Sequence, residues 1–162
     1  KYCMGEIYMI RGINFKSDDE KDKVISLWYQ AALNEYNFLP IDYFKNESKI
    51  LYDNLDLQNI LVCEYKDDIL GFVGMIDKEC ISYLYVDTLY QHRGIGTALL
   101  NELKKNHSIL EVKVFKEANS INFFTDNDFK IVREDEDTKT GQKIYYMKWI
   151  NKGVGNGKIF NS

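Results

Sequence analysis

The chain has 162 residues, of which 45% are hydrophobic and 28% charged, and its formal net charge is −4 at pH 7. This length suits one domain with a single sizeable core. The longest apolar run, residues 69–76, is much shorter than the roughly 20 residues of a membrane-spanning helix. The excess of acidic residues argues against binding to nucleic-acid phosphates. We therefore expect neither a membrane nor a nucleic-acid partner.

The cysteines indicate a reducing environment. Cys3, Cys63 and Cys80 are odd in number and have no metal-ligand spacing, and no secretory signal precedes them. We therefore expect a cytoplasmic protein without a metal site.

The first part of the chain is predicted to form a strand and two helices. The strand begins at Met9. Ser17 and Glu20 form a capping box, which predicts a helix over residues 18–36. Pro40 can open a second helix, whose apolar face consists of Ile41, Phe44 and Leu51.

The hydrophobic period becomes strand-like near residue 59. Short β-rich runs between charged turns predict an antiparallel meander over residues 60–65, 69–76 and 80–86. Further along we expect a helix from 94 with Ile95, Leu99 and Leu103 on one face, a strand over 109–115, a short helix over 119–127, and strands over 129–134 and 142–149. These elements predict one α/β domain with a mixed sheet and helices on both faces.

Two glycines, Gly94 and Gly96, lie where the turn after the strand ending at Val86 opens the next helix. The first N–H groups of a helix have no intrahelical acceptor, the helix dipole adds partial positive charge, and glycine lets a ligand approach closely. This arrangement is typical of a phosphate site. The lysine of a P-loop and the three-glycine spacing of a Rossmann motif are both lacking.

Residues 91–96, QHRGIG, match the Q/R-x-x-G-x-G/A motif of the GNAT (GCN5-related N-acetyltransferase) superfamily. The strand before this motif and the later segment NSINFFTDNDFKIV also resemble the family, and NEYNFLPIDYF is similar to small bacterial stand-alone acetyltransferases. The resemblance implies a GNAT fold over residues 9–150, with a mixed, mostly antiparallel sheet whose fourth and fifth strands splay to admit the cofactor. Residues 1–8 and 151–162 are then extensions, native or artificial.

The cofactor that the resemblance implies is acetyl-CoA. Backbone N–H groups from Arg93 to Ala98 are expected to bind its pyrophosphate, and the strand at residues 84–86 is expected to hold the pantetheine arm beside the strand at 110–114. The residues expected to bind the cofactor are Leu84, Tyr85, Val86, Gln91, His92, Arg93, Gly94, Ile95, Gly96, Thr97, Ala98, Asn119, Phe123 and Phe124.

The resemblance further implies direct transfer of the acetyl group to a primary amine in a ternary complex, which benefits from a general base and a general acid. Phe124 occupies the position of the tyrosine that many members use as the acid. Asp128 replaces the usual glycine, and aspartate tolerates a left-handed conformation better than most residues. Ser82 and Cys80 occupy the usual base positions, and strand alternation places them on the face of residues 84 and 86. Small residues on an inner strand are also common core residues.

Our catalytic hypothesis is a water-relayed deprotonation assisted by Ser82, with Cys80 as a weaker candidate for the same role. Tyr145 or its neighbour Tyr146 is the candidate acid, unless no protein acid is used. The first two helices are expected to roof the acceptor pocket with aromatic residues and one carboxylate, which suit an amine through cation–π and charge contacts. These residues are Tyr29, Glu35, Tyr36, Phe38 and Tyr43. Tyr29 and Phe38 are equally consistent with a core, and a carboxylate such as Glu35 near the end of a helix is more often simply solvated.

Two other functions remain open. A non-catalytic acyl-CoA sensor would keep the cofactor site without the acid and base. An α/β domain of another kind would use the glycine turn for a different phosphate ligand or only for its structure. The acceptor is left open among small molecules, peptides and proteins, and the oligomeric state between monomer and homodimer.

Overall fold

The computed structural model describes residues 8–153. Cys3 and nearly all of the two expected extensions lie outside this range. Tyr8, which we placed in the first extension, is 7% exposed and packs edge-on against Tyr65, with ring centroids 5.5 Å apart. Its side chain is therefore part of the core.

The helices and strands of the described residues follow one another in the expected order. Its elements are β1 (Met9–Gly12), α1 (Asp18–Glu35), α2 (Ile41–Asn54), η1 (Leu55–Leu57), β2 (Asn59–Tyr65), β3 (Asp68–Met75), β4 (Cys80–Val86), η2 (Thr88–Tyr90), α3 (Ile95–Lys104), β5 (Ile109–Phe115), α4 (Ser120–Asp126), β6 (Lys130–Glu136) and β7 (Lys143–Ile150). The short 3-10 helices η1 and η2 are additions to the expected set.

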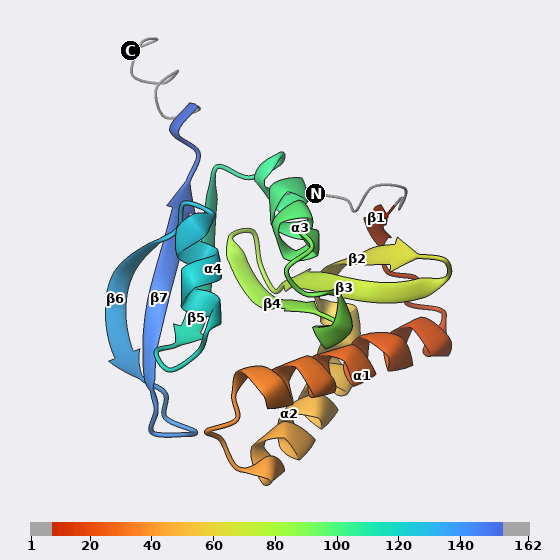
Figure 1. Cartoon of the computed structure of the whole chain (residues 1–162), viewed down its shortest axis with the longest axis horizontal. Coiled ribbons are helices and arrows are strands. Elements are labelled where there is room, and N and C mark those ends of the chain that lie inside the picture. The colour runs from red at the N-terminus through yellow and green to blue at the C-terminus, as the bar shows by residue number, and fades with distance from the viewer. Residues whose placement is uncertain (1–7, 154–162) are drawn as a thin grey trace.

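The strands form a seven-stranded sheet in the order β1-β2-β3-β4-β5-β7-β6. Every neighbouring pair is antiparallel except β4 and β5, which are parallel. Helices α1 and α2 lie side by side against one face, whereas α3 and α4 lie on the other (Figure 1). This confirms the expected single α/β domain with a mixed, mostly antiparallel sheet.

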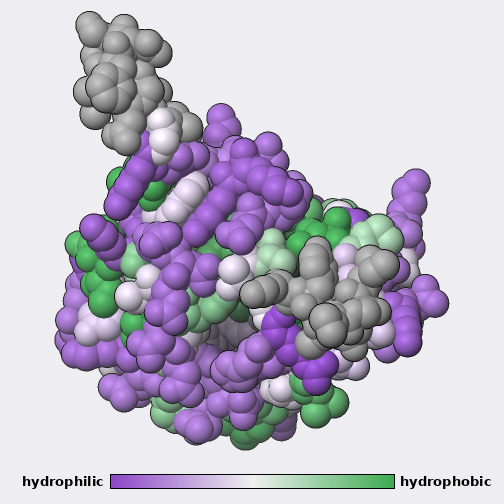
Figure 2. Space-filling model, turned by 45° about the horizontal axis from the view of Figure 1, so that its top comes forward, coloured by the Kyte–Doolittle hydropathy of each residue, from purple (hydrophilic) through white to green (hydrophobic). Residues whose placement is uncertain are grey.

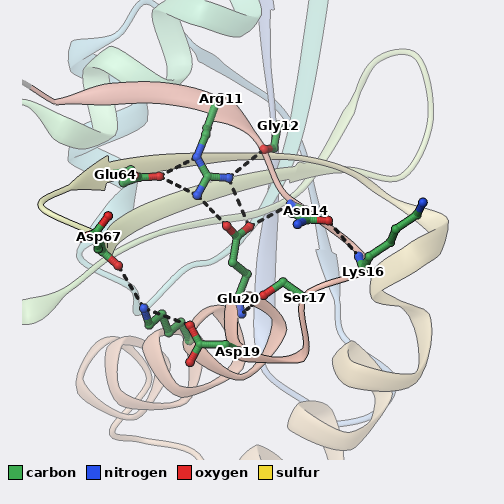
Figure 3. A network of polar contacts seen from close by, with 10 residues as sticks. Arg11, Gly12, Asn14, Lys16, Ser17, Asp19, Glu20, Glu64 and Asp67 are labelled. Atoms are coloured by element: carbon green, nitrogen blue, oxygen red, sulfur yellow. Dashed lines mark hydrogen bonds and ion pairs between the residues drawn. The ribbon is translucent and has the colours of Figure 1, made fainter.

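The N-terminal end of α1 is fixed to the sheet edge by a charged network (Figure 3). The Ser17 hydroxyl caps the helix by accepting the N–H of Glu20 at 3.2 Å, as expected. The Glu20 carboxylate does not close the capping box; it accepts the N–H of Asn14 at 2.8 Å and bonds Arg11 at 2.6 Å. Arg11 also donates to Glu64 of β2 at 2.6 Å, so β1, α1 and β2 share one guanidinium.

Helix α2 follows Pro40, its N-cap residue, and buries Phe44 and Leu51. Ile41, which the helical spacing grouped with them, is 51% exposed because it lies in the first turn, at the end of the helix. The buried side chains of both layers form one hydrophobic cluster, in which Phe44, Phe72 and Phe129 are the largest fully buried residues.

The surface of the described residues is mostly polar. Hydrophilic side chains predominate on the face in Figure 2, and hydrophobic ones form separate patches there. Within residues 8–153, no helix is long and apolar enough to cross a membrane. The edge strand β6 is exposed along its whole length, and its charged residues and register shift protect an otherwise open sheet edge.

Candidate active site

The central feature of the site is the divergence of β4 and β5. These strands pair only at Cys80 with Glu111 and at Ile81 with Val112. Toward their carboxyl ends the strands separate, and in Figure 1 β5–β7 stand apart from β1–β4. Within the described residues, the β5 side of β4 therefore offers backbone N–H and C=O groups without a strand partner from Ser82 onward. This is the expected splay.

The glycine turn lies at the open end of the splay, between η2 and α3. Gly94 is the N-cap residue of α3 with φ 84, a left-handed conformation that favours glycine, and it provides no side-chain cap. His92 also has a positive φ, of 63. The N–H groups in the first turn of α3 therefore receive no side-chain cap from Gly94. N–H groups at a helix N-terminus are the kind of site that we expected to bind a phosphate.

The side chains of the turn make contacts of their own. The Gln91 amide donates to the carbonyl of Val86 at 3.1 Å, so it fixes the turn to the end of β4. The guanidinium of Arg93 is exposed and lies over the Tyr90 ring, 5.1 Å from its centroid. Arg93 therefore remains available to an anion, whereas Gln91 has a structural role.

The start of α3 is anchored by its own side chains. Ile95 is 2% exposed and belongs to the core, so it can offer a ligand only its backbone. The Thr97 hydroxyl accepts the side-chain amide of Asn127, just beyond α4, at 3.5 Å. Asn119 is the N-cap residue of α4 and makes no side-chain cap.

Helix α4 contacts the first turn of α3 through Phe123. A Cβ atom at Gly96 would lie 3.1 Å from the Phe123 ring, so the two helices approach closely there. Phe124 is 4% exposed and packs against Phe123 and Phe129, with ring centroids 5.2 and 5.3 Å away. Asp128 has φ 70, the left-handed conformation that the usual glycine would adopt.

Aromatic side chains bridge the splay on the face covered by α1 and α2. We call them the aromatic wall: Tyr36, Phe38, Tyr43, Tyr85 and Phe115. The Phe115 ring of β5 lies 5.1 Å from Tyr36 and 5.9 Å from Phe38, centroid to centroid. The hydroxyls of Tyr36 and Tyr85 are 3.2 Å apart and form a hydrogen bond that connects the wall to β4.

The wall is aromatic and carries no charge of its own. Burial raises the pKa of Tyr36, and it raises the pKa of Tyr85 as well. Both hydroxyls are therefore neutral at physiological pH, and neither is a ready base. A cation at the wall would therefore meet the faces of aromatic rings and two hydroxyl groups that are fixed in place.

Ser82 lies on the opposite face from the one that strand alternation predicted. A register shift after Gly74 places the side chains of both Ser82 and Tyr83 against Gly74, where a Cβ would lie 3.4 and 3.6 Å from their nearest atoms. In a β-bulge, two residues of one strand lie opposite a single residue of the partner strand, and this interrupts the alternation of side chains between the two faces of the sheet. The placement of Ser82 on the face of Leu84 and Val86 was therefore wrong, and Ser82 faces the side of α1.

Ser82 has a partner that the sequence did not reveal. Its hydroxyl bonds the side-chain oxygen of Gln58 and lies 3.0 Å from the carbonyl of Gly74. Gln58 is 6% exposed and is the buried polar residue of the described core. It follows η1 in a turn, where a glutamine gives no sequence signal of burial.

Cys80 lies at the paired end of β4, away from the open part of the splay. Burial raises the pKa of its thiol, and the carboxylate of Asp77 raises it further. Cys80 is therefore a protonated thiol at neutral pH. The structure does not bring it together with the aromatic wall or the turn.

The remaining predicted residues are distributed around the site. Tyr145 of β7 pairs with Val114 of β5, and the Lys116 ammonium lies 5.7 Å from the Tyr145 ring centroid. Tyr145 therefore lies in the β5–β7 half of the sheet, across the splay from β4.

Two residues of α1 have structural contacts. The carboxylate of Glu35 accepts the N–H of Ser120 at 2.8 Å, so it ties the end of α1 to α4. Tyr29 packs edge-on against Trp28, with ring centroids 6.4 Å apart. Neither belongs to the aromatic wall.

The sequence profile described as an acetyltransferase (GNAT) domain matches residues 41–151, which include β4, the turn, α3 and α4. The chain belongs to this family. The resemblance to the GNAT superfamily and the expected fold are thereby confirmed.

The chain is also similar to individual proteins, one of them by sequence and two by fold. The peptidyl-lysine N-acetyltransferase YiaC of Escherichia coli is 26% identical over 133 residues, 80% of this chain and 90% of YiaC. YjaB of Escherichia coli in its apo form has a TM-score of 0.78 at 15% identity, covering 90% of this chain and 99% of YjaB. The PaiA N-acetyltransferase of Thermoplasma acidophilum, solved with coenzyme A, has a TM-score of 0.73 at 19% identity, with the same coverage, 90% and 99%.

Proposed function

We propose that the protein transfers an acetyl group from acetyl-CoA to a primary amine by direct transfer in a ternary complex. The observation that carries this proposal is the splay between β4 and β5, which has the Gly94 turn on one side and the aromatic wall on the other. An extended, anionic cofactor suits this combination, because it requires both a strand-like partner and a phosphate site.

The residues present suit acetyl-CoA. The N–H groups at the start of α3, with Arg93 beside them, would hold the pyrophosphate, and the backbone of Leu84–Val86 would hold the pantetheine arm. Phe123, next to Gly96, would line the passage between α3 and α4. When bound, the cofactor supplies the acyl group as a reactive thioester.

The chain's own polar groups are candidates for proton transfer. Ser82 and Gln58 are hydrogen-bonded to each other on the acceptor side of β4, where they can orient a water molecule that accepts the proton of an incoming amine. Tyr145 is our candidate for the acid that protonates the departing thiolate. General acid and base assistance contributes roughly 10²–10⁴ in rate, so loss of either group should slow the reaction without abolishing it.

The similarity to YiaC, a peptidyl-lysine N-acetyltransferase, supports lysine side chains as one class of acceptor. A small-molecule amine and a protein N-terminus are the other classes to compare. The aromatic wall suits all three, because it recognises a cationic amine and its alkyl chain rather than a particular scaffold.

The test is a calorimetric titration with acetyl-CoA, followed in the same sample by thiol release with small amines, a lysine peptide and a peptide N-terminus. We expect micromolar binding that ATP and NAD do not compete away, and thiol release with at least one acceptor. Absence of binding to acetyl-CoA would overturn the proposal. Ser82→Ala should change the dependence of turnover on pH if Ser82 orients the accepting water.

A second candidate function, an acyl-CoA sensor without catalysis, is favoured by one observation. Phe124 stands at the usual tyrosine position and is buried among other aromatic rings, so this position supplies no acid. A sensor would bind acetyl-CoA with the same affinity and release no thiol with any acceptor in the panel. Thiol release above the rate of buffer hydrolysis therefore excludes it.

A further inference from the structure

A groove leads from the aromatic wall to the surface between α2 and the turn that joins β6 to β7. Its volume is about 860 Å³, and the residues that concern us in its lining are Phe38, Pro40, Tyr43, Glu47, Ile50 and Lys139. Phe38 and Tyr43 belong both to this groove and to the wall, where Tyr43 lies 6.5 Å from Phe115. The groove is therefore continuous with the place at which the acceptor amine would react.

Glu47 and Lys139 form an ion pair across this groove. The Lys139 ammonium lies 2.9 Å from the Glu47 carboxylate, and the two residues are 92 positions apart in the sequence. The Glu47 side chain is 18% exposed, whereas that of Lys139 is 61% exposed. The carboxylate is thus the fixed partner, and the lysine reaches it from a surface turn.

The charge of Glu47 acts at the wall. The pKa of Tyr43 is raised mainly by burial and secondly by the carboxylate of Glu47. The same two causes, in the same order, raise the pKa of Tyr83. Tyr43 and Glu47 are four residues apart on one face of α2, which corresponds to a rise of about 6 Å along the helix. Glu47 therefore lies about one helical turn further along the groove than the wall.

We propose that Glu47 binds a second cationic group of the acceptor, and that the Lys139 ammonium occupies this position until the acceptor displaces it. The proposal rests on the acetyltransferase function proposed above and names its preferred acceptors: primary amines with a second ammonium group a few methylene units away. The reacting amine must lose its proton at the uncharged wall, while the second ammonium stays charged at Glu47. Phe38 and Pro40, which precede α2, supply apolar side chains for the alkyl linker at the wall end of the groove.

The experiment compares diaminopentane with aminopentane, which have the same chain length and differ by one ammonium group. Initial rates of thiol release with saturating acetyl-CoA give KM and kcat for each amine. In the wild-type protein we expect a KM for the diamine about tenfold below that for the monoamine, because a hydrogen-bonded ion pair at a largely buried carboxylate contributes about that much. Equal KM values for the two amines would overturn the proposal.

Two variants separate the roles of the ion pair. Glu47→Gln should raise the KM for the diamine to that for the monoamine. Lys139→Gln should lower the KM for the diamine about twofold to fivefold, because the competing ammonium is gone. A rise in the diamine KM with Lys139→Gln would contradict the displacement.

Matched controls lie on the same helix outside the groove. Asp42→Asn and Lys45→Gln change exposed charges of α2 that do not line the groove, and they should leave the ratio of the two KM values unchanged. Thermal unfolding of each variant shows whether it is folded.

Direct binding distinguishes this proposal from the proposed function. Calorimetric titration of the protein with diaminopentane in the presence of coenzyme A reports on Glu47 even if no thiol is released. Binding that Glu47→Gln abolishes supports the acceptor site in either case. Thiol release with aminopentane but no preference for the diamine would leave the acetyltransferase function intact and remove this inference.

Discussion

Single residues decide the direction of the chain at the cofactor site. Gly94 turns the chain from η2 into α3 with φ 84, and Asp128 turns it after α4 with φ 70. Both conformations are left-handed, and a residue with a Cβ is strained there by about 1–2 kcal/mol. At Gly94 that strain would fall on the helix start whose N–H groups are expected to meet the pyrophosphate.

Gly94→Ala should therefore weaken acetyl-CoA binding about tenfold, because the strained turn moves the first N–H groups of α3 out of position. Calorimetry measures the affinity. The matched control is Gly141→Ala, since Gly141 has φ 69 in the turn between β6 and β7. It should lose a similar amount of stability and keep its acetyl-CoA affinity; a comparable loss of affinity in both variants would mean that Gly94 acts only through stability.

Tyr145→Phe should lower kcat with little change in KM, because the variant keeps the ring and loses the proton donor. The control is Tyr146→Phe. Tyr146 is the next residue of β7 and faces the other side of the sheet, where the Arg133 guanidinium lies 3.9 Å from its ring centroid. Steady-state kinetics with one acceptor is sufficient, and equal kcat values for wild type and Tyr145→Phe would remove Tyr145 as the acid.

At the scale of elements, α1 is fixed at both ends to different parts of the molecule. Arg11, Glu20 and Glu64 join its first turn to β1 and β2 (Figure 3). At its other end, Glu35 accepts the first N–H of α4. The helix therefore spans both halves of the divided sheet, and it positions Tyr36 of the aromatic wall directly after its last turn.

The network at the start of α1 predicts a pH dependence of stability. The hydrogen bond from Arg11 lowers the pKa of Glu20 below its ordinary 4.5. A carboxyl whose pKa is lower in the folded state contributes stability above its ordinary pKa, and this contribution is lost as the pH falls through the folded pKa.

Glu20→Gln should accordingly reduce the free energy of unfolding by about 1–3 kcal/mol at pH 7, and the difference from wild type should shrink below pH 4.5. Urea denaturation between pH 7 and pH 3 measures both quantities. Glu117→Gln, at an exposed position after β5, should follow the wild-type curve. A difference that is constant over this pH range would show that charge at Glu20 is not the cause.

At the scale of the whole molecule, the sheet is divided into β1–β4 and β5–β7 by the splay (Figure 1). The two halves are held together by the short β4–β5 pairing on one side and by the aromatic wall on the other. In the described chain this leaves backbone groups of β4 without a strand partner, and a ligand that pairs with these groups completes the sheet.

Acetyl-CoA should therefore slow amide hydrogen exchange in two separate segments, residues 82–86 of β4 and the first turn of α3. Hydrogen exchange followed by mass spectrometry, with and without acetyl-CoA, measures this. The edge strand β6 is remote from the splay in the strand order and should exchange at the same rate in both samples. Protection confined to other segments would place the cofactor elsewhere on the molecule.

The sequence alone determined the features that depend on neighbours within a few positions. The Ser17 cap, the strand meander and the turn from Gln91 through Gly94 into α3 follow from local propensity and hydrophobic period, which act over one or two turns of chain. The motif at residues 91–96 indicated the family for the same reason, because its geometry is local.

Only the tertiary structure decided which side chains meet across the site. Tyr36 and Tyr85 are 49 residues apart, Glu35 and Ser120 are 85 apart, and Glu47 and Lys139 are 92 apart; these are the pairs that build the wall, its support and the groove. No local pattern encodes such pairs, because each depends on how α1, α2 and the β6–β7 turn pack around the divided sheet.

The face of Ser82 was decided in the same way. A bulge opposite Gly74 reversed the face that alternation predicted, and it brought the hydroxyl to Gln58. Alternation is a property of one strand, whereas a bulge arises when one strand of a pair carries an extra residue relative to its partner. The sequence of β4 therefore identified Ser82 as a candidate, and its pairing with β3 determined what Ser82 can touch.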